Sequence, residues 1–124
     1  MELEKQEVET PRIPEGPSEQ QIQEWKNQFG EVFVSVFSDT EKYIWRPIIR
    51  SEWISLHSYI SSQGDKVTQY NFEEMICDTC ILWKSNKISW DKVKAGTIGA
   101  LNEQILQASN FVDPQTASYL VAKL

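Results

Sequence analysis

Residues 43–53 of this 124-residue chain read Tyr-Ile-Trp-Arg-Pro-Ile-Ile-Arg-Ser-Glu-Trp. Apolar side chains alternate before Pro47, as in a strand, whereas those after it recur at helical spacing. Proline disfavours helical backbone in the residue before it and cannot donate to a sheet ladder. Pro47 therefore predicts a corner where a strand ends and a helix begins, and we expect the rest of the chain to pack around this corner.

Before the corner, the sequence predicts one helix and a β-hairpin. The helix begins after Ser18, a suitable N-cap, and ends at Gly30. Strands over residues 31–37 and 42–46 are joined by the polar connection 38–41. Two strands alone are marginally stable in water, so we expect the hairpin to lie on helices.

After the corner, the apolar spacing predicts four more helices. They cover residues 51–62, 71–83, 98–109 and 114–124. Their suggested N-caps are Asn71, Thr97 and Asp113, the last followed by a proline at the first helical position. Between the second and third of these helices, residues 84–89 are predicted to form a basic polar turn and residues 90–93 one helical turn. Asn110 suits the end of the third.

Length and composition favour one folded domain preceded by an acidic arm. The chain is too short for two ordinary domains, and 40% hydrophobic residues with five tryptophans suffice for one core. Residues 1–30 hold seven acidic and three basic side chains, and three prolines lie within residues 1–17. We predict a mostly helical α+β protein. It has an extended arm over residues 1–17, and its single domain, residues 18–124, packs one β-hairpin on a small bundle of four to five helices.

The composition argues against three classes of function. Nucleic-acid binding through phosphates needs a stripe of lysine and arginine, which the sequence lacks. Its longest apolar runs are far shorter than the roughly 20 residues that span a bilayer. The first residues, Met-Glu-Leu-Glu-Lys, do not have the basic start and apolar centre of a secretory signal. We therefore expect a cytosolic protein whose two cysteines are reduced.

Cys77 and Cys80 have a spacing found in metal and redox sites. A structural zinc site needs four ligands, and the sequence offers neither a second cysteine pair nor any histidine besides His57. Cys80 lies on the apolar face of its predicted helix, where a thiol behaves as a small hydrophobic group. His57 shares a helical stripe with Trp53, so we interpret it as a packing residue. We predict a non-enzymatic protein with no metal or cofactor.

Arginine and tryptophan residues are the best candidates for binding a protein partner. Arg46 and Arg50 flank the corner. In a structural role they pair with Glu52 or Glu41, or cap the carbonyls of neighbouring elements. In a functional role they hold the acidic arm or a partner's carboxylate. Five tryptophans are more than a core of this size needs, so some belong to exposed patches. The candidate partner-binding residues are Trp25, Trp45, Arg46, Arg50, Trp53 and Trp90.

Short strings spread over residues 22–111 form a recognisable pattern. They are Trp25-Lys26-x-x-Phe29-Gly30-x-Val32-Phe33, Trp45-Arg46-Pro47-x-x-Arg50-x-Glu52-Trp53, Glu73-Glu74-x-Ile76-Cys77-x-x-Cys80-Ile81-Leu82-Trp83, Ala95-Gly96 and Leu101-x-x-x-Ile105-Leu106-x-x-Ser109-x-Phe111. This pattern resembles small tail proteins of contractile-tailed bacteriophages, a group that includes tail assembly chaperones and baseplate hub assembly proteins. The chain has Ser109-Asn110-Phe111 where that group has Ser-Gly-Phe, a mild departure because asparagine also tolerates the left-handed cap conformation.

The resemblance implies a non-enzymatic role in the phage tail. A tail assembly chaperone coats the hydrophobic tape-measure protein and then leaves, whereas a baseplate or hub adaptor stays in the virion. We therefore expect other tail or baseplate proteins as partners, within an oligomeric assembly and without nucleic acid or membrane. The expected location is the virion tail or, during assembly, the host cytoplasm. The alternative is a phage-encoded regulator that binds a host protein or acts as an acidic decoy.

Deleting residues 1–17 tests the division into arm and domain. The thermal unfolding midpoint should stay almost unchanged, because the arm adds little to the core, while partner binding should weaken. A melt showing that the truncation itself unfolds the domain would contradict this division.

Overall fold

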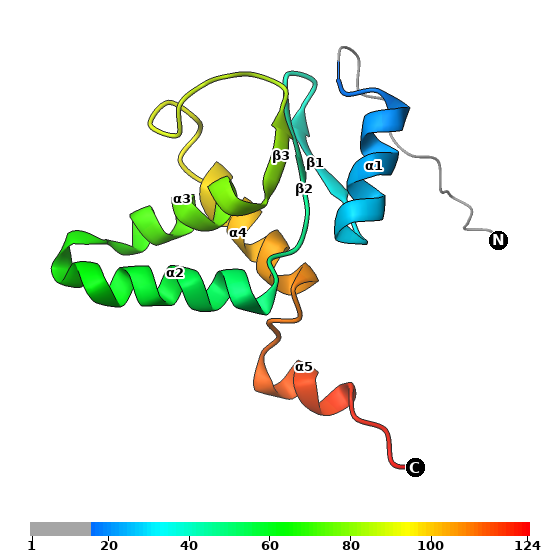
Figure 1. Cartoon of the computed structure of the whole chain (residues 1–124), viewed down its shortest axis with the longest axis vertical. Helices are drawn as coiled ribbons and strands as arrows, with labels where there is room; N and C mark the ends of the chain where they lie inside the picture. The colour runs from blue at the N-terminus through cyan, green and yellow to red at the C-terminus, as the bar shows by residue number, and fades with distance from the viewer. Residues whose placement is uncertain (1–15) are drawn as a thin grey trace.

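The computed structural model describes residues 16–124, which form a three-stranded antiparallel sheet with helices on both sides (Figure 1). The elements in chain order are α1 (Glu19–Phe29), β1 (Phe33–Ser38), β2 (Glu41–Trp45), α2 (Arg50–Gln63), the 3-10 helix η2 (Gly64–Lys66), α3 (Gln69–Cys80), β3 (Ile81–Lys84), α4 (Thr97–Ala108) and α5 (Pro114–Tyr119). The predicted fold class, a mostly helical α+β protein, is confirmed. The predicted arm lies outside the described residues except for positions 16 and 17.

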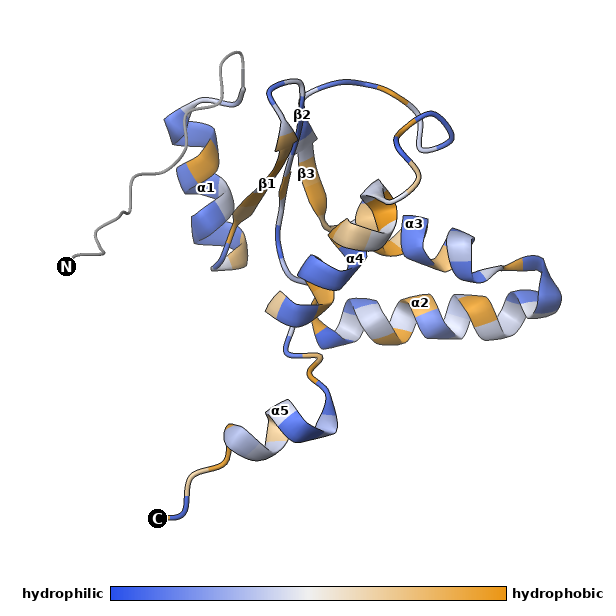
Figure 2. Ribbon diagram, turned by 180° about the vertical axis from the view of Figure 1, so that it is seen from behind, coloured by the Kyte–Doolittle hydropathy of each residue, from blue (hydrophilic) through white to orange (hydrophobic). Residues whose placement is uncertain are grey.

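The two faces of the sheet are covered by different helices. Figures 1 and 2 place α1 on one side of the sheet and α3 and α4 on the other. Residues paired across strands share a face, so the row Val34–Ile44–Trp83 faces one way, towards α1. Tyr43 and Trp45, which alternate with Ile44, face α3 and α4 and belong to the main core. Burial on both faces explains why β2 is apolar throughout its second half.

The main core lies between the sheet and the α3–α4 pair. Its buried members are Tyr43, Trp45, Ile48, Ile76, Cys77, Cys80, Leu101 and Ile105. The buried amide of Asn102 fixes how α3 and α4 cross, because its Nδ2 donates to the carbonyl oxygens of Glu73 at 2.8 Å and Ile98 at 3.2 Å. A buried amide without such partners would be costly, so the contact favours this one arrangement.

A carboxylate joins β2 to the start of α4. Glu41 accepts hydrogen bonds from the Tyr43 hydroxyl at 2.9 Å and from the Thr97 hydroxyl at 3.2 Å. Burial, followed by the hydrogen bond to Glu41, raises the pKa of Tyr43, so its hydroxyl stays a donor throughout the physiological range.

The four residues after α3 form strand β3, whereas the sequence pattern predicted that the helix would continue to Trp83. The prediction of a helix through Trp83 is therefore wrong, since α3 ends at Cys80. In β3, Trp83 lies opposite Ile44 and Ile81 lies opposite Trp45. Isoleucine and tryptophan suit strands, and their pairing satisfies backbone groups on the second edge of β2. The predicted two-stranded hairpin is thus one part of a three-stranded sheet.

Several predicted helix ends are confirmed. The Ser18 hydroxyl accepts the N–H of Gln21 at 3.0 Å, and Gly30 ends α1 with a φ of 89°. At α5, the Asp113 carboxylate accepts the N–H of Thr116 at 2.8 Å. These three signals are local in sequence, so they could be read without knowledge of the tertiary structure.

Other predicted helix ends are wrong. Thr68 rather than Asn71 is the N-cap of α3, and the two side chains reciprocate in a capping box. Gly96 precedes α4, so Thr97 is its first residue and bonds Glu41 instead of capping. The last helix ends at Tyr119 rather than at Leu124, because so short a helix needs packing that its exposed residues do not receive.

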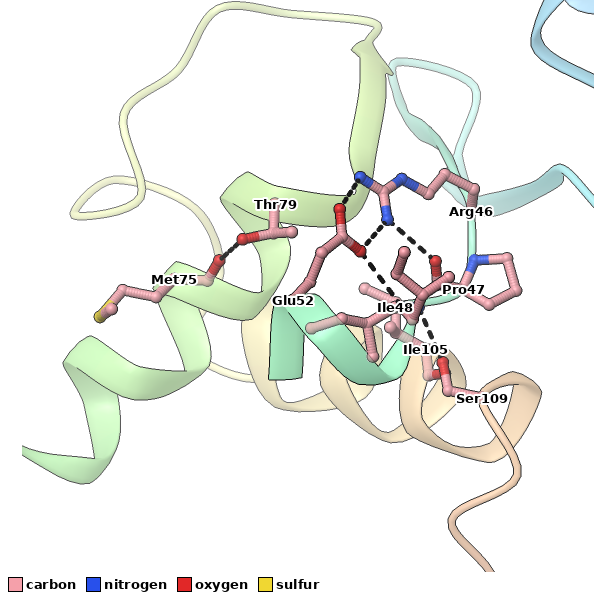
Figure 3. Close-up of polar contacts among 9 residues, drawn as sticks. Arg46, Pro47, Ile48, Glu52, Met75, Thr79, Ile105 and Ser109 are labelled. Atoms are coloured by element: carbon pink, nitrogen blue, oxygen red, sulfur yellow. Dashed lines mark hydrogen bonds and ion pairs between the residues drawn. The ribbon is translucent and has the colours of Figure 1, made fainter. Parts of the chain in front are cut away.

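At the corner, a buried arginine pairs with the first turn of α2 (Figure 3). Arg46 Nη1 lies 2.5 Å from Glu52 Oε1, and Nη2 lies 2.9 Å from Oε2, which is the two-point geometry that favours arginine. Glu52 Oε1 also accepts the N–H of Ile49 at 3.1 Å, so one carboxylate both neutralises the arginine and caps α2. Of the roles considered for Arg46, the pairing with Glu52 is present, and Arg46 Nη1 also donates to the carbonyl of Pro47 at 3.1 Å (Figure 3).

The corner also contacts three other helices. The backbone N–H of Arg46 donates to the carbonyl of Cys80 at the end of α3, at 3.1 Å. The N–H of Ile48 donates to the Ser109 hydroxyl at the end of α4, at 2.9 Å (Figure 3). On the other side, the guanidinium carbon of Arg46 lies 4.7 Å from the centre of the Phe29 ring of α1. Helices α1, α2, α3 and α4 therefore meet at this corner, where the sequence led us to expect the chain to pack.

The substitution Glu52→Gln tests the ion pair. It should lower the free energy of unfolding by about 3 kcal/mol, because it leaves the nearly buried guanidinium of Arg46 without a counter-charge. Urea unfolding at pH 7, followed by tryptophan fluorescence, measures the change. As a control, the double substitution Arg46→Met with Glu52→Leu should cost less than Glu52→Gln alone, since it leaves no buried charge.

The same pair has a defined pH dependence. The hydrogen bond from Arg46 lowers the pKa of Glu52 from its ordinary value of 4.5. A lowered pKa in the folded state means that the stabilisation is complete above 4.5 and is lost as the pH falls through the folded value. The difference in stability between wild type and Glu52→Gln should therefore narrow below about pH 4.5, and a difference that grows there would contradict this assignment.

Candidate partner-binding surface

One side of α2 is open to solvent along its length and forms a shallow groove of about 580 Å³. The groove is lined by Arg50, Trp53, Ile54, His57, Ser58 and Ser61. These positions are spaced i, i+3, i+4, i+7, i+8 and i+11 along α2, which places them on a single helical stripe of about three turns. We call this stripe the α2 face.

The α2 face carries one charged side chain, Arg50. Charged residues make up 24% of the chain, and the other charged residue of α2, Glu52, is paired with Arg46. Ile54 on this face is 47% exposed and lies next to half-buried Trp53. Few charges together with exposed aromatic and aliphatic groups are typical of the centre of a protein–protein interface.

An aromatic cluster supports the middle of the α2 face. The Trp53 ring lies 4.5 Å from His57, 5.5 Å from Phe72 of α3 and 4.6 Å from Phe111 beyond α4, centre to centre. His57 also contacts Phe72, at 5.2 Å. Rings at such distances stabilise one another and hold their orientation. Trp53 is therefore half-buried and held in place before any partner arrives.

The end of α4 places Phe111 against Trp53. Asn110 adopts the left-handed conformation with a φ of 72°, as its position in the sequence suggested. The N–H of Asn110 then donates to Gln107 at 3.1 Å, and that of Phe111 donates to Leu106 at 2.9 Å. These two bonds form a Schellman motif, which turns the chain sharply. The reversal brings the Phe111 ring back to α2.

Two of the six candidate residues, Trp45 and Arg46, are not available to a partner. Trp45 is 4% exposed: its indole stacks on Phe33 at 4.7 Å and donates to the Ser35 hydroxyl at 2.7 Å. Arg46 is 7% exposed and paired with Glu52. Their prediction as surface residues is wrong, because both lie where the sheet meets the corner. A surplus of tryptophans could not show which of them the sheet would bury.

The other four candidates lie in three separate places. Arg50 and Trp53 belong to the α2 face. Trp25 is half-buried on α1, on the other side of the sheet from α3 and α4. Trp90 lies beyond β3, where it donates to Asp78 at 2.9 Å and receives the Lys84 ammonium over its ring at 4.1 Å. The candidates therefore do not form one site.

The two cysteines belong to the core. Cys77 and Cys80 have no exposed surface, and burial raises the pKa of Cys77 to about 12 and that of Cys80 to about 11. Thiols with such pKa values are protonated at neutral pH and are poor nucleophiles. Within residues 16–124, no cluster of three or more His, Cys, Asp or Glu side chains is placed to hold a metal ion.

The sequence analysis missed three residues of this surface. Ile54 was not singled out, His57 was assigned to packing alone although it is exposed, and Phe111 entered only through the resemblance. One signal was available: between Arg50 and Gln63, serines occupy five positions where lysine or glutamate is usual on a surface helix. Phe111 and Trp53 are 58 positions apart in the sequence, so no local sequence pattern could have predicted their contact.

Comparison with known proteins found no match for this chain. The chain matches no protein-family model, and neither a characterised protein nor a solved structure shows significant similarity to it. The resemblance to phage tail proteins accordingly stays a prediction.

Substitutions at Asn110 test how the surface is built. Asn110→Gly should keep the fold and the fluorescence of Trp53, because glycine adopts the left-handed conformation freely. Asn110→Val should cost about 1–2 kcal/mol, because a β-branched side chain clashes with its own backbone there. Thermal unfolding and tryptophan emission measure both effects. Equal stability of the two variants would show that the reversal at Asn110 does not depend on its left-handed backbone.

Proposed function

We propose that this protein is a non-enzymatic phage tail protein that binds other tail proteins through the α2 face. It serves either as a baseplate or hub adaptor or as a tail assembly chaperone. The observation that carries the binding role is the α2 face itself, an exposed helical stripe with one charge and a preformed aromatic centre. The assignment to the tail rests on the sequence resemblance.

The geometry supports a particular mode of binding. An amphipathic segment of the partner lays its apolar side chains into the groove against Ile54 and Trp53, as helices do in hydrophobic grooves. Trp53 loses little freedom on binding because its neighbours already hold it. Arg50, at one end of the groove, pairs with a carboxylate of the partner and so sets the direction in which the segment lies. Residues 1–17 contribute a second, acidic contact.

The state of the polar groups supports binding rather than catalysis. The thiols are buried and protonated, and Arg46 and Glu52 neutralise each other. In residues 16–124, no helix is long and apolar enough to cross a bilayer. We assign the protein no cofactor and no nucleic-acid partner.

The substitution Ile54→Glu tests the α2 face. It places a charge in the middle of the groove and should weaken the binding of a tail protein about tenfold, or about 1.4 kcal/mol. Stability should change little, because Ile54 is 47% exposed. The measurement is quantitative mass spectrometry of tail proteins that co-purify with the tagged chain from infected cells.

Gln107→Glu is the matched control, since it adds the same charge to an exposed position of α4. Recovery of tail proteins should equal that of the wild type for this variant. If Ile54→Glu behaves like the control, the α2 face is not the binding surface.

Purified particles distinguish the two forms of the proposal. Presence of the chain at an integer ratio to tail proteins identifies an adaptor. Abundance in infected cells but absence from particles identifies an assembly chaperone. Recovery of a host protein instead, with normal tails formed in the absence of this chain, would favour the alternative, a regulator of a host protein.

A further inference from the structure

The connection from β3 to α4 is rich in lysine. Residues 84–94 contain four lysines and one aspartate, a net charge of +3 in eleven residues, whereas the whole chain has a net charge of −6. The lysines are Lys84, Lys87, Lys92 and Lys94. Charge of one sign is thus concentrated in a single connection, which we call the basic loop.

Contacts at the beginning and in the middle of the basic loop hold it against the domain. The Ser85 hydroxyl accepts the N–H of Lys42 at 2.8 Å and donates to the carbonyl of Thr40 at 2.9 Å. Further along, Trp90 packs on Tyr43 at 5.9 Å. Since these contacts are made with β2 and the turn before it, the charges of the loop are presented from a supported backbone.

Three of the four lysines have no partner in the described part of the chain. Lys84 lies over the Trp90 ring, but Lys87, Lys92 and Lys94 are exposed. The ion pair formed within residues 16–124 joins Arg46 to Glu52, so no carboxylate there neutralises these three. Like charges so close together repel one another, and a segment of opposite charge relieves this repulsion.

A segment of matching charge precedes the domain. Residues 1–15 hold five glutamates against one lysine and one arginine, a net charge of −3. We propose that the basic loop is a second interaction surface, one that binds an acidic polypeptide segment, and that residues 1–15 of the same chain occupy it. The charge of the segment equals that of the loop with opposite sign.

The segment is long enough to reach the loop. Fifteen residues span at most roughly 50 Å. A compact domain of this size is roughly 35 Å across, which is less than the length of the extended segment. A covalently joined segment that can span the distance acts at an effective concentration in the millimolar range. Weak, salt-sensitive pairing therefore suffices for occupancy, and an acidic partner that competes for the same lysines releases residues 1–15 for their own contact with that partner.

Paramagnetic relaxation in the full-length chain tests the contact. The substitution Val8→Cys provides a site for a nitroxide label, because the native thiols are fully buried, with pKa values of about 12 and 11, and do not react at pH 7. At about 20 mM salt, amide signals of residues 84–94 should lose intensity while those of α2 keep theirs. At about 500 mM salt the lost intensity should return, because screening shortens to a few ångströms.

Charge variants and a mixed sample decide the interpretation. Reversing Lys87, Lys92 and Lys94 to glutamate should abolish the loss of intensity. Reversing Lys26, Lys66 and Lys123, three exposed lysines elsewhere, changes the net charge equally and should preserve it. The proposal would be overturned if these amide signals kept their intensity in the wild type, or if they still lost it after the three lysines of the basic loop were changed to glutamate. A mixed sample would also overturn it, in which one set of chains carries only the nitroxide and the other only the NMR isotope. Loss of amide intensity in that mixture would mean that the occupant of the basic loop is a second copy of the chain.

Discussion

The pairing of Arg46 with Glu52 is the interaction on which the other contacts of this fold depend. A guanidinium that is almost fully buried is costly unless a carboxylate faces it, and Glu52 does so with both oxygens. The pair makes the strand-to-helix corner a defined structure, because the carboxylate also caps α2. From the corner, backbone N–H groups donate to the carbonyl of Cys80 at the end of α3 and to the Ser109 hydroxyl at the end of α4, and the Phe29 ring of α1 covers the guanidinium.

This arrangement explains why α2 is available for binding. The helix is held at its first turn by Glu52 and along one side by half-buried Trp53, Leu56 and Ile60, while all fourteen of its residues, each of them described, keep some exposure. The outer side of α2 therefore contributes little to the packing of the domain. The serines and Ile54 found there add little to the stability of the domain and are available to a partner.

Polar groups were assigned correctly where their partners are close in sequence. Ser18, Gly30, Asp113 and the left-handed Asn110 act through bonds that span three to five residues, so the residue type alone indicates the geometry. Thr97 and Asn71 were misassigned because each competes with a nearby alternative, and contacts with Glu41 and Thr68 decide the outcome. Trp83 was placed on a helix because its spacing from Ile76 fits one, although β2 required a third strand.

The sequence by itself determined the fold class, the position of the corner, the order of most elements and the apolar character of the two cysteines. These depend on the period of the hydrophobic pattern and on proline, glycine and capping residues, which act locally. Only the tertiary structure decided that Trp45 and Arg46 are buried, that β3 completes the sheet, and that Phe111 joins Trp53 on the α2 face. The solvent exposure of an aromatic side chain depends on segments that are distant in sequence. It is therefore fixed only when those segments pack together.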